Sequence, residues 1–168
     1  MAELVEDKVL VEEKRERDRL IGKGFGELEG RKLVLDLKEA LYLLEKEKLA
    51  VKKGKRKVKE KELLALGEKG EKKFYSKFLV FRDLRDRGFV VKTGFKFGFD
   101  LRVYPRGKKP GEEHTQWCVH IATAGQSLRM PSLSRMVRLA GNINTVVLLA
   151  VVDSENDINY YEIERIIP

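Results

Sequence analysis

The chain has 168 residues, a hydrophobic fraction of 42% and a formal net charge of +8, which allows one ordinary domain or two small ones and favours a polyanionic partner. Its single cysteine, Cys118, excludes an internal disulfide and a cysteine zinc cluster. No apolar run approaches the roughly 20 residues that span a bilayer, and the N-terminus is charged rather than signal-like. We therefore expect a protein of the reducing cytoplasm with no membrane association. The high charged fraction, 37%, is typical of proteins that work at high temperature.

The first third of the chain predicts a small domain. Residues 1–20 combine an apolar start with dense mixed charge, which indicates an exposed arm, or a strand with a charged extension. Glycines at positions 22, 24, 26 and 30 indicate a turn region with a short strand. A helix should follow, with Asp36 as its N-cap. Its apolar positions recur at three- and four-residue spacing: Leu37, Ala40, Leu41, Leu44 and Leu49.

A strongly basic run, KKGKRKVKEK, covers residues 52–61 with seven basic residues and one acid. One interpretation is a phosphate-binding patch, since each neutralised phosphate releases counterions and strengthens binding to RNA at low salt. The other is a solvated loop or helix face, which is the commoner role of charge runs. The sequence alone leaves both open.

The next segment, residues 63–88, predicts two helices separated near Gly67 and Gly70, the second of which ends at Gly88. From Phe89 the apolar period changes to two, which predicts strands separated at Gly94 and Gly98. Residues 115–124 predict another alternating strand, with Cys118 and His120 on the face opposite Trp117, Val119 and Ile121.

The last third predicts a helix over residues 132–141, capped by Ser132 or Ser134 and stopped by Gly141. The continuous apolar run 145–152 predicts a central strand buried on both faces, and residues 158–167 a final strand after an acidic turn. We therefore expect a mixed α/β protein. A small α+β domain with the basic linker would cover residues 1–66, and a nuclease-like domain with a central mixed sheet flanked by helices would cover residues 67–168.

Two parts of the chain resemble archaeal-type tRNA-splicing endonucleases. The segment FLVFRDLRDRGFVVKTGFKFGFDLRVY, residues 78–104, with the later His114, is similar to the C-terminal domain of that family. The segment LDLKEALYLLEKEKLAV, residues 35–51, is similar to its small N-terminal domain. The resemblance implies cleavage of precursor tRNA at bulge-helix-bulge structures, without a cofactor.

The resemblance also implies roles for single residues. Tyr104 falls where the family keeps the base for the RNA 2′-hydroxyl, and His114 where it keeps the acid for the leaving 5′ oxygen. When the comparison with the family is continued along the chain without gaps, the third catalytic position, a lysine in the family, falls at Thr145. Arg138 matches an arginine that in the family packs against a base of the bulge. Without the lysine charge we expect a severely weakened active site, because such a donor contributes about 10² to 10³ in rate.

The residues themselves argue against hydrolysis by metal ions. Two-metal nucleases hold magnesium with carboxylates from neighbouring strands. Asp100 would be one ligand, but the strand that follows, TQWCVHIA, has no acid and no lysine. We therefore expect no metal site. RNA cleavage by its own 2′-hydroxyl needs only a base, an acid and a cation, and leaves 2′,3′-cyclic phosphate and 5′-hydroxyl ends.

The acidic turn before the last strand bears on assembly. The resemblance implies that Asp153, Glu155 and Asp157 insert into a basic pocket of an opposing subunit and that the final strands pair tail to tail. We expect a structural, non-cutting subunit that joins a catalytic subunit in a heterotetramer, a homo-oligomer being the alternative. Two other interpretations stay open. One is an active subunit in which a lysine from elsewhere fills the gap at Thr145, and the other is a basic RNA-binding protein of the same fold that cuts nothing.

Overall fold

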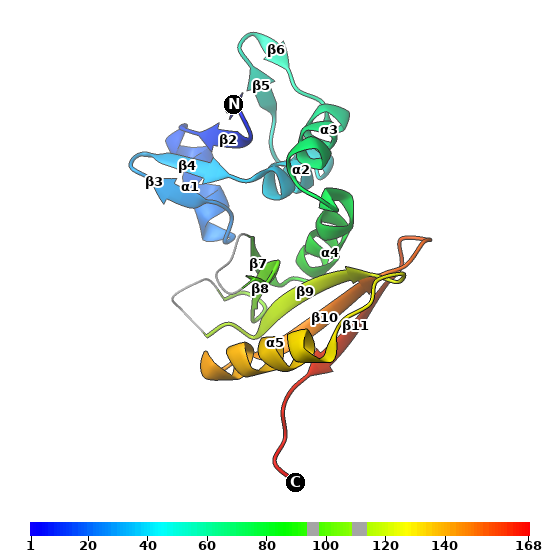
Figure 1. Ribbon diagram of the computed structural model, residues 1–168. Helices are drawn as coiled ribbons and strands as arrows, with labels where there is room; N and C mark the ends of the chain where they lie inside the picture. Colours follow the sequence, from blue (N-terminus) through cyan, green and yellow to red (C-terminus); the bar gives the residue numbers. More distant parts are fainter. Residues whose placement is uncertain (94–97, 109–113) are drawn as a thin grey trace. The chain divides into compact units, whose positions relative to one another are not determined.

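The computed structural model describes residues 1–93, 98–108 and 114–168. They form two compact units, Met1–Phe78 and Leu79–Pro168, each built around its own sheet (Figure 1). Two mixed sheets with helices confirm the predicted α/β class. The domain boundary between residues 66 and 67 stays a prediction.

The first unit carries a six-stranded sheet of order β3-β4-β2-β1-β5-β6. Strand β1 pairs in parallel with β5 and antiparallel with β2, so the sheet is mixed. The elements in chain order are β1 (Ala2–Val5), β2 (Lys8–Val11), α1 (Lys14–Gly22), β3 (Glu27–Glu29), β4 (Lys32–Leu35), α2 (Leu37–Glu45), β5 (Val51–Lys53), β6 (Arg56–Lys57) and α3 (Glu60–Gly70), with α4 (Phe74–Asp86) leading into the second unit.

The N-terminus of α2 is fixed by the predicted cap. The Asp36 carboxylate accepts a hydrogen bond from the Glu39 N–H at 2.9 Å, and the Glu39 carboxylate accepts one from the Asp36 N–H at 3.2 Å. This reciprocal capping box satisfies two N–H groups that the helix itself leaves unpaired. Glu39 also accepts a bond from the N–H of Gly26, which has φ +69°, and so ties the preceding glycine-rich turn to the helix. Leu49 lies beyond the end of α2.

The first 20 residues are more ordered and more buried than their pattern predicted. They do contain strands, but Ala2, Val9 and Val11 are fully buried, so this segment is core and not an exposed arm. The charged extension is helix α1, whose N-cap, Glu13, accepts hydrogen bonds from the backbone N–H groups of Arg15 and Glu16. Leu20 is the one fully buried side chain of α1, which explains why the sequence shows no apolar stripe there.

The break between α3 and α4 lies after Gly70, and Gly67 is inside α3. A Cβ atom placed on Gly67 would overlap the ring of Phe74, whereas one on Gly70 meets nothing within 4 Å. The absence of a side chain at Gly67 therefore lets the start of α4 pack against α3. The sequence identified both glycines but not their different roles.

We expect Gly67→Ala to destabilise the protein even though alanine favours helices. The added methyl group overpacks the contact with Phe74, which typically costs about 1–3 kcal/mol, against a gain in helix propensity of up to about 1 kcal/mol. Gly70→Ala is the matched control, and we expect it to be neutral or slightly stabilising. Urea denaturation of the two variants measures the difference, and equal stabilities would refute this packing role.

The second unit carries a five-stranded sheet of order β11-β10-β9-β8-β7. Strands β9 and β10 are parallel, and the other neighbours are antiparallel. Helices α4 and α5 lie on opposite faces of the sheet (Figure 1). The elements after α4 are β7 (Val90–Thr93), β8 (Leu101–Tyr104), β9 (Trp117–Thr123), α5 (Met130–Asn142), β10 (Val146–Val152) and β11 (Ile158–Ile163). Of the two glycines predicted to separate the strands after Phe89, Gly94 lies outside the described residues.

Helix α5 begins earlier than predicted. Its N-cap is Arg129, which makes no side-chain capping bond, and Pro131 stands in the first turn. The fixed φ of proline suits that position, so the helix starts before Ser132 and Ser134, and neither is its cap. It ends at Asn142, one residue beyond the predicted stop. Its apolar side packs on a cluster formed by Phe99, Cys118, Ala140 and Val147.

Strand β10 lies inside the sheet, between β9 and β11, as its apolar sequence predicted. Its two faces are not equally covered. Leu148, Ala150 and Val152 are buried on one face, whereas Leu149 and Val151, on the other, are only half-buried. The prediction of burial on both faces is therefore wrong for the second half of this strand, because α5 packs over its first half, around Val147.

Candidate functional site

Strand register brings three chain segments to one end of the five-stranded sheet. Val103 of β8 is opposite Trp117 of β9, and Trp117 is opposite Val146 of β10. The end of β8 therefore meets the beginnings of β9 and β10. Tyr104 follows Val103, and Thr145 precedes Val146, so both lie at this end, separated by two strand spacings or roughly 10 Å.

The same register puts Tyr104 and Thr145 on one face. Paired residues share a face and successive residues alternate, so Tyr104 lies on the face of Arg102, Cys118 and Val147, and Thr145 follows the same alternation. This is the face that α5 covers. Tyr104 is 4% exposed and Thr145 is 7% exposed. Two of the three residues singled out from the sequence are thus brought together, and both are largely covered.

Thr145 is held against the end of α5. Its backbone N–H donates to the Ala140 carbonyl at 3.0 Å, and its buried hydroxyl makes no hydrogen bond of good geometry within the part of the chain that the structure describes. The hydroxyl lies near the Cys118 thiol. Burial raises the pKa of that thiol to about 11, and the Arg102 charge and the Thr145 hydroxyl oppose the increase only weakly. Cys118 is therefore neutral at physiological pH and has no nucleophilic role here.

His114 and Arg138 are both exposed. His114 precedes β9 by three residues, at the end of the sheet where Tyr104 and Thr145 lie. Arg138 is on α5, in the half that leads into Thr145. The chain thus gathers a phenol, an imidazole and a guanidinium near one end of the sheet. Their roles in catalysis or RNA binding remain predictions.

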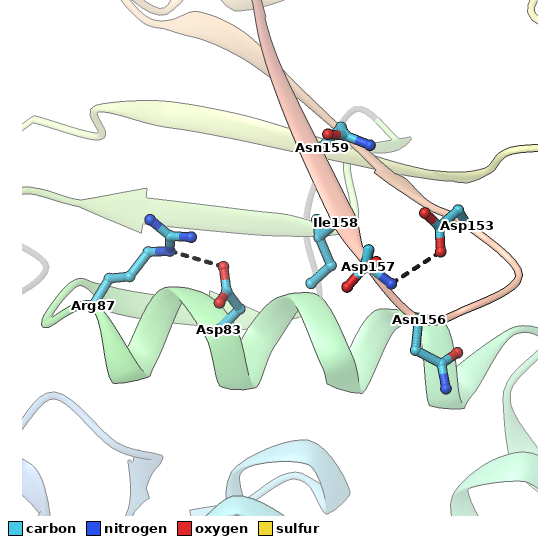
Figure 2. A pocket seen from close by; sticks show the side chains of 7 residues that line it. All are labelled: Asp83, Arg87, Asp153, Asn156, Asp157, Ile158 and Asn159. Carbon is cyan, nitrogen blue, oxygen red and sulfur yellow. Dashed lines mark hydrogen bonds and ion pairs between the residues drawn. The ribbon is translucent and has the colours of Figure 1, made fainter.

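The acidic turn lies at the other end of β10, and Asp153 is roughly 26 Å from Thr145 at the usual rise per strand residue. Asp153 holds it together, because one of its carboxylate oxygens accepts two backbone hydrogen bonds. One comes from the N–H of Glu155, at 2.8 Å, and the other from the N–H of Asp157, at 3.0 Å (Figure 2). Glu155 and Asp157 are exposed. The three acids therefore differ in function: Asp153 orders the backbone, and the other two present their charges outward.

Helix α4 carries an acidic residue, Asp83, that faces this turn and that the sequence did not single out. The Asp83 carboxylate accepts hydrogen bonds from Arg87, at 2.9 Å, and from the Tyr160 hydroxyl, at 2.7 Å. Burial and the neighbouring carboxylate raise the pKa of Tyr160. The turn and α4 border an open hollow of about 500 Å³ (Figure 2). It is lined by Asp83, Arg87, Asp153, Asn156, Asp157, Ile158 and Asn159. Asp83 and Tyr160 are 77 positions apart in sequence, so no local pattern could have joined them.

A second unforeseen cluster lies beside the end of β8. The Arg106 guanidinium stacks 4.8 Å from the centre of the Phe89 ring, and Phe89 meets Trp117 edge to face at 5.3 Å.

Asp100, considered from sequence as a metal ligand, instead accepts the Ile121 N–H at 2.8 Å. In the described ranges no three His, Cys, Asp or Glu side chains gather as metal ligands would. Likewise no helix there is long and apolar enough to cross a membrane.

Comparisons with known sequences show the family of this chain. A family model described as "tRNA intron endonuclease, catalytic C-terminal domain" matches residues 74–160, and one described as "tRNA intron endonuclease, N-terminal domain" matches residues 1–64. The chain is an α/β protein with both domains of these nucleases. It belongs to the tRNA intron endonuclease family.

Individual relatives cover nearly the whole chain. It is 39% identical to the tRNA-splicing endonuclease of Pyrococcus furiosus over 94% of this chain and 91% of that protein. It is 42% identical to that of Thermococcus gammatolerans, over 83% of this chain and 82% of the relative. A tRNA-splicing endonuclease of Methanococcoides burtonii is 32% identical over 98% of this chain, but the match takes up only 46% of that longer protein.

Proposed function

We propose that this chain is a structural subunit of a tRNA-splicing endonuclease, and that it binds precursor tRNA with bulge-helix-bulge structure without cutting it. The observation that carries the proposal is Thr145. The end of the sheet carries Tyr104, which is 4% exposed, and the exposed His114, but position 145, where the resemblance implies a lysine, has a short neutral side chain, 7% exposed and packed against the end of α5.

The chemistry explains why one missing charge matters. In the proposed reaction the RNA 2′-oxygen bonds to the adjacent phosphorus while the bond from phosphorus to the 5′ oxygen breaks. A base takes the 2′-hydroxyl proton and an acid gives a proton to the leaving 5′ oxygen. Tyr104 and His114 would supply these groups. The phosphorane carries extra negative charge in the transition state, and a threonine hydroxyl does not balance it as an ammonium group would.

The base is affected as well. A tyrosine titrates near ~10 in water, so a useful fraction of phenolate at neutral pH depends on nearby positive charge. A lysine at position 145 would supply such a charge about two strand spacings from Tyr104. Its absence therefore weakens both the base and the stabilisation of the transition state. In this proposal Arg138 still stacks on a bulge nucleotide, since it is exposed on α5 and carries a planar cation.

The structural role rests on the acidic turn. Asp153 preorganises its backbone, and Glu155 and Asp157 are exposed and ready to meet cations of another subunit. Strand β11 is the edge of its sheet, so its outer backbone groups are available for pairing with a partner. We propose a heterotetramer with a catalytic subunit that carries tyrosine, histidine and lysine, working in the cytoplasm on precursor tRNA.

One observation favours an active chain instead. Arg102 lies two residues before Tyr104 on the same face, and its charge reaches Cys118, which also neighbours Thr145. It would be the compensating cation if the chain cuts alone, and Arg102→Met would then abolish cleavage. The third interpretation, an RNA-binding protein outside any cutting complex, would be favoured if no catalytic partner co-purifies and no cleavage is seen.

We expect the isolated chain to cut bulge-helix-bulge RNA slowly or not at all, and the complex with its catalytic partner to cut without metal ions. The measurement is cleavage with and without EDTA, followed by analysis of the ends. The expected ends are a 2′,3′-cyclic phosphate and a 5′-hydroxyl. Loss of activity in EDTA, or 3′-hydroxyl and 5′-phosphate ends, would rule out the proposed chemistry.

A further inference from the structure

Most of the basic run of residues 52–61 forms a hydrogen-bonded hairpin, and only its end, from the N-cap Lys59 on, belongs to the start of helix α3. Strands β5 and β6 pair antiparallel, and Gly54, with φ +62°, occupies their turn. Val51 and Val58 anchor the base of the hairpin, since both are at most 1% exposed and the Val58 N–H donates to the Val51 carbonyl at 2.8 Å. The basic side chains are thus displayed on a fixed frame.

Most of this charge is in no ion pair with the residues that the structure describes. Glu3 lies 3.7 Å from Lys52, and Glu62 holds Arg56 through two hydrogen bonds, at 2.8 and 2.7 Å. The remaining five basic side chains are exposed and make no ion pair with any residue that the structure describes. They are Lys53, Lys55, Lys57, Lys59 and Lys61.

The arrangement places like charges against each other. Lys52 is directly opposite Lys57, and Lys53 is opposite Arg56. Like charges at such cross-strand positions destabilise a hairpin. Lys59 is the N-cap of α3 and makes no capping bond, so it adds positive charge at the end of the helix where the dipole is already positive. A polyanion would relieve each of these repulsions.

Protection of a sheet edge is a weaker explanation. Strand β6 is the edge of its sheet, and lysines do blunt exposed edges. That purpose needs charge on the edge strand alone. Here β5, which is paired on both sides, carries lysines too, and the basic run continues past the hairpin to Lys59, the N-cap of α3, before Glu60 and Glu62 begin the helix.

We propose that the β5–β6 hairpin, together with Lys59 at the N-cap of α3, binds the phosphate backbone of the RNA substrate. This inference rests on the proposed function, because it takes RNA as the substrate. It assigns the first unit a part in RNA binding through charge, independent of base sequence and of Tyr104, His114 and Thr145.

The test is a triple variant of the full chain, Lys53→Gln, Lys55→Gln and Lys57→Gln. Its matched control, Lys14→Gln, Lys48→Gln and Lys72→Gln, removes the same charge from exposed lysines elsewhere in the first unit. Fluorescence anisotropy with labelled bulge-helix-bulge RNA at 50–300 mM KCl measures affinity. We expect the hairpin variant to bind about ten-fold or more weakly at the lowest salt. Its salt slope, log K against log[KCl], should become shallower by about 2, since each lost phosphate contact removes about 0.7–0.9.

The control triple should change the affinity less than two-fold. Equal losses in both triples would mean that only overall charge matters, and an unchanged affinity in the hairpin triple would mean that the hairpin does not touch RNA; either result overturns the inference. Thermal melting of each variant verifies folding. If the unaltered chain binds bulge-helix-bulge RNA no better than a plain duplex of equal length, the proposed function fails instead, and the two failures are distinguishable.

Discussion

Thr145→Lys should turn this chain into a nuclease, with cleavage of bulge-helix-bulge RNA rising by about 10² to 10³. The new ammonium group would lie at the end of the sheet with Tyr104 and His114 and supply the missing transition-state charge. The C-terminal end of α5 packs against position 145, and its carbonyl groups favour a cation there. Single-turnover cleavage of labelled RNA by the purified variant measures the gain.

Two further variants test whether the gain comes from the proposed site. Adding Tyr104→Phe to Thr145→Lys should return cleavage to the level of the unaltered chain, and Thr145→Met, of similar length but uncharged, should gain nothing. Circular dichroism confirms that each variant is folded. Rapid cleavage by the unaltered chain, with no increase in Thr145→Lys, would show that position 145 is not the missing catalytic position.

Neutralising the outward acids of the turn should dissociate the assembly. We expect Glu155→Gln with Asp157→Asn to weaken association with the partner at least about 100-fold, because cations buried on the other subunit would lose their counter-charges at about 3–5 kcal/mol for each lost pair. Asp153 is kept, since it holds the backbone of the turn. Sedimentation velocity at several salt concentrations measures the effect.

The matched control is Glu27→Gln with Glu29→Gln, which removes the same charge from the exposed strand β3 of the first unit. It should leave the assembly intact. An assembly that survives in the turn variant as well would mean that the turn is a solvated loop and that subunits are held together elsewhere.

Local signals predicted much of the fold. The Asp36 cap, helix α2 and the interior position of β10 all depend on side chains close in sequence, and each is confirmed. The predicted start of α5 was wrong because the helix begins at Met130, with Pro131 in its first turn, before either serine that the sequence offered as a cap. The sequence left the N-terminal segment open between an exposed arm and a strand, because a burial pattern only four residues long, as in β1 and β2, is too brief to separate a core strand from an arm.

The residues of the candidate site could be found from sequence, but their arrangement could not. Tyr104, His114 and Thr145 were singled out by resemblance, but only the register of β8, β9 and β10 explains why Tyr104 and Thr145 lie at one end of the sheet on one face. The separate function of Asp153 depends on backbone hydrogen bonds within the turn, which composition does not reveal. The contact of Asp83 with Tyr160 joins α4 to β11 and has no local signature.

The most direct test of the structural-subunit role uses the assembled complex and alters this chain alone. Cleavage is measured for complexes in which this subunit carries Tyr104→Phe with His114→Ala, or is unaltered, each joined to the unaltered catalytic partner. We expect the same cleavage rate within two-fold, because the partner supplies all of the reacting groups. A loss of 100-fold or more, with the complex still assembled, would show that this chain takes part in the chemistry and would contradict the role proposed for it.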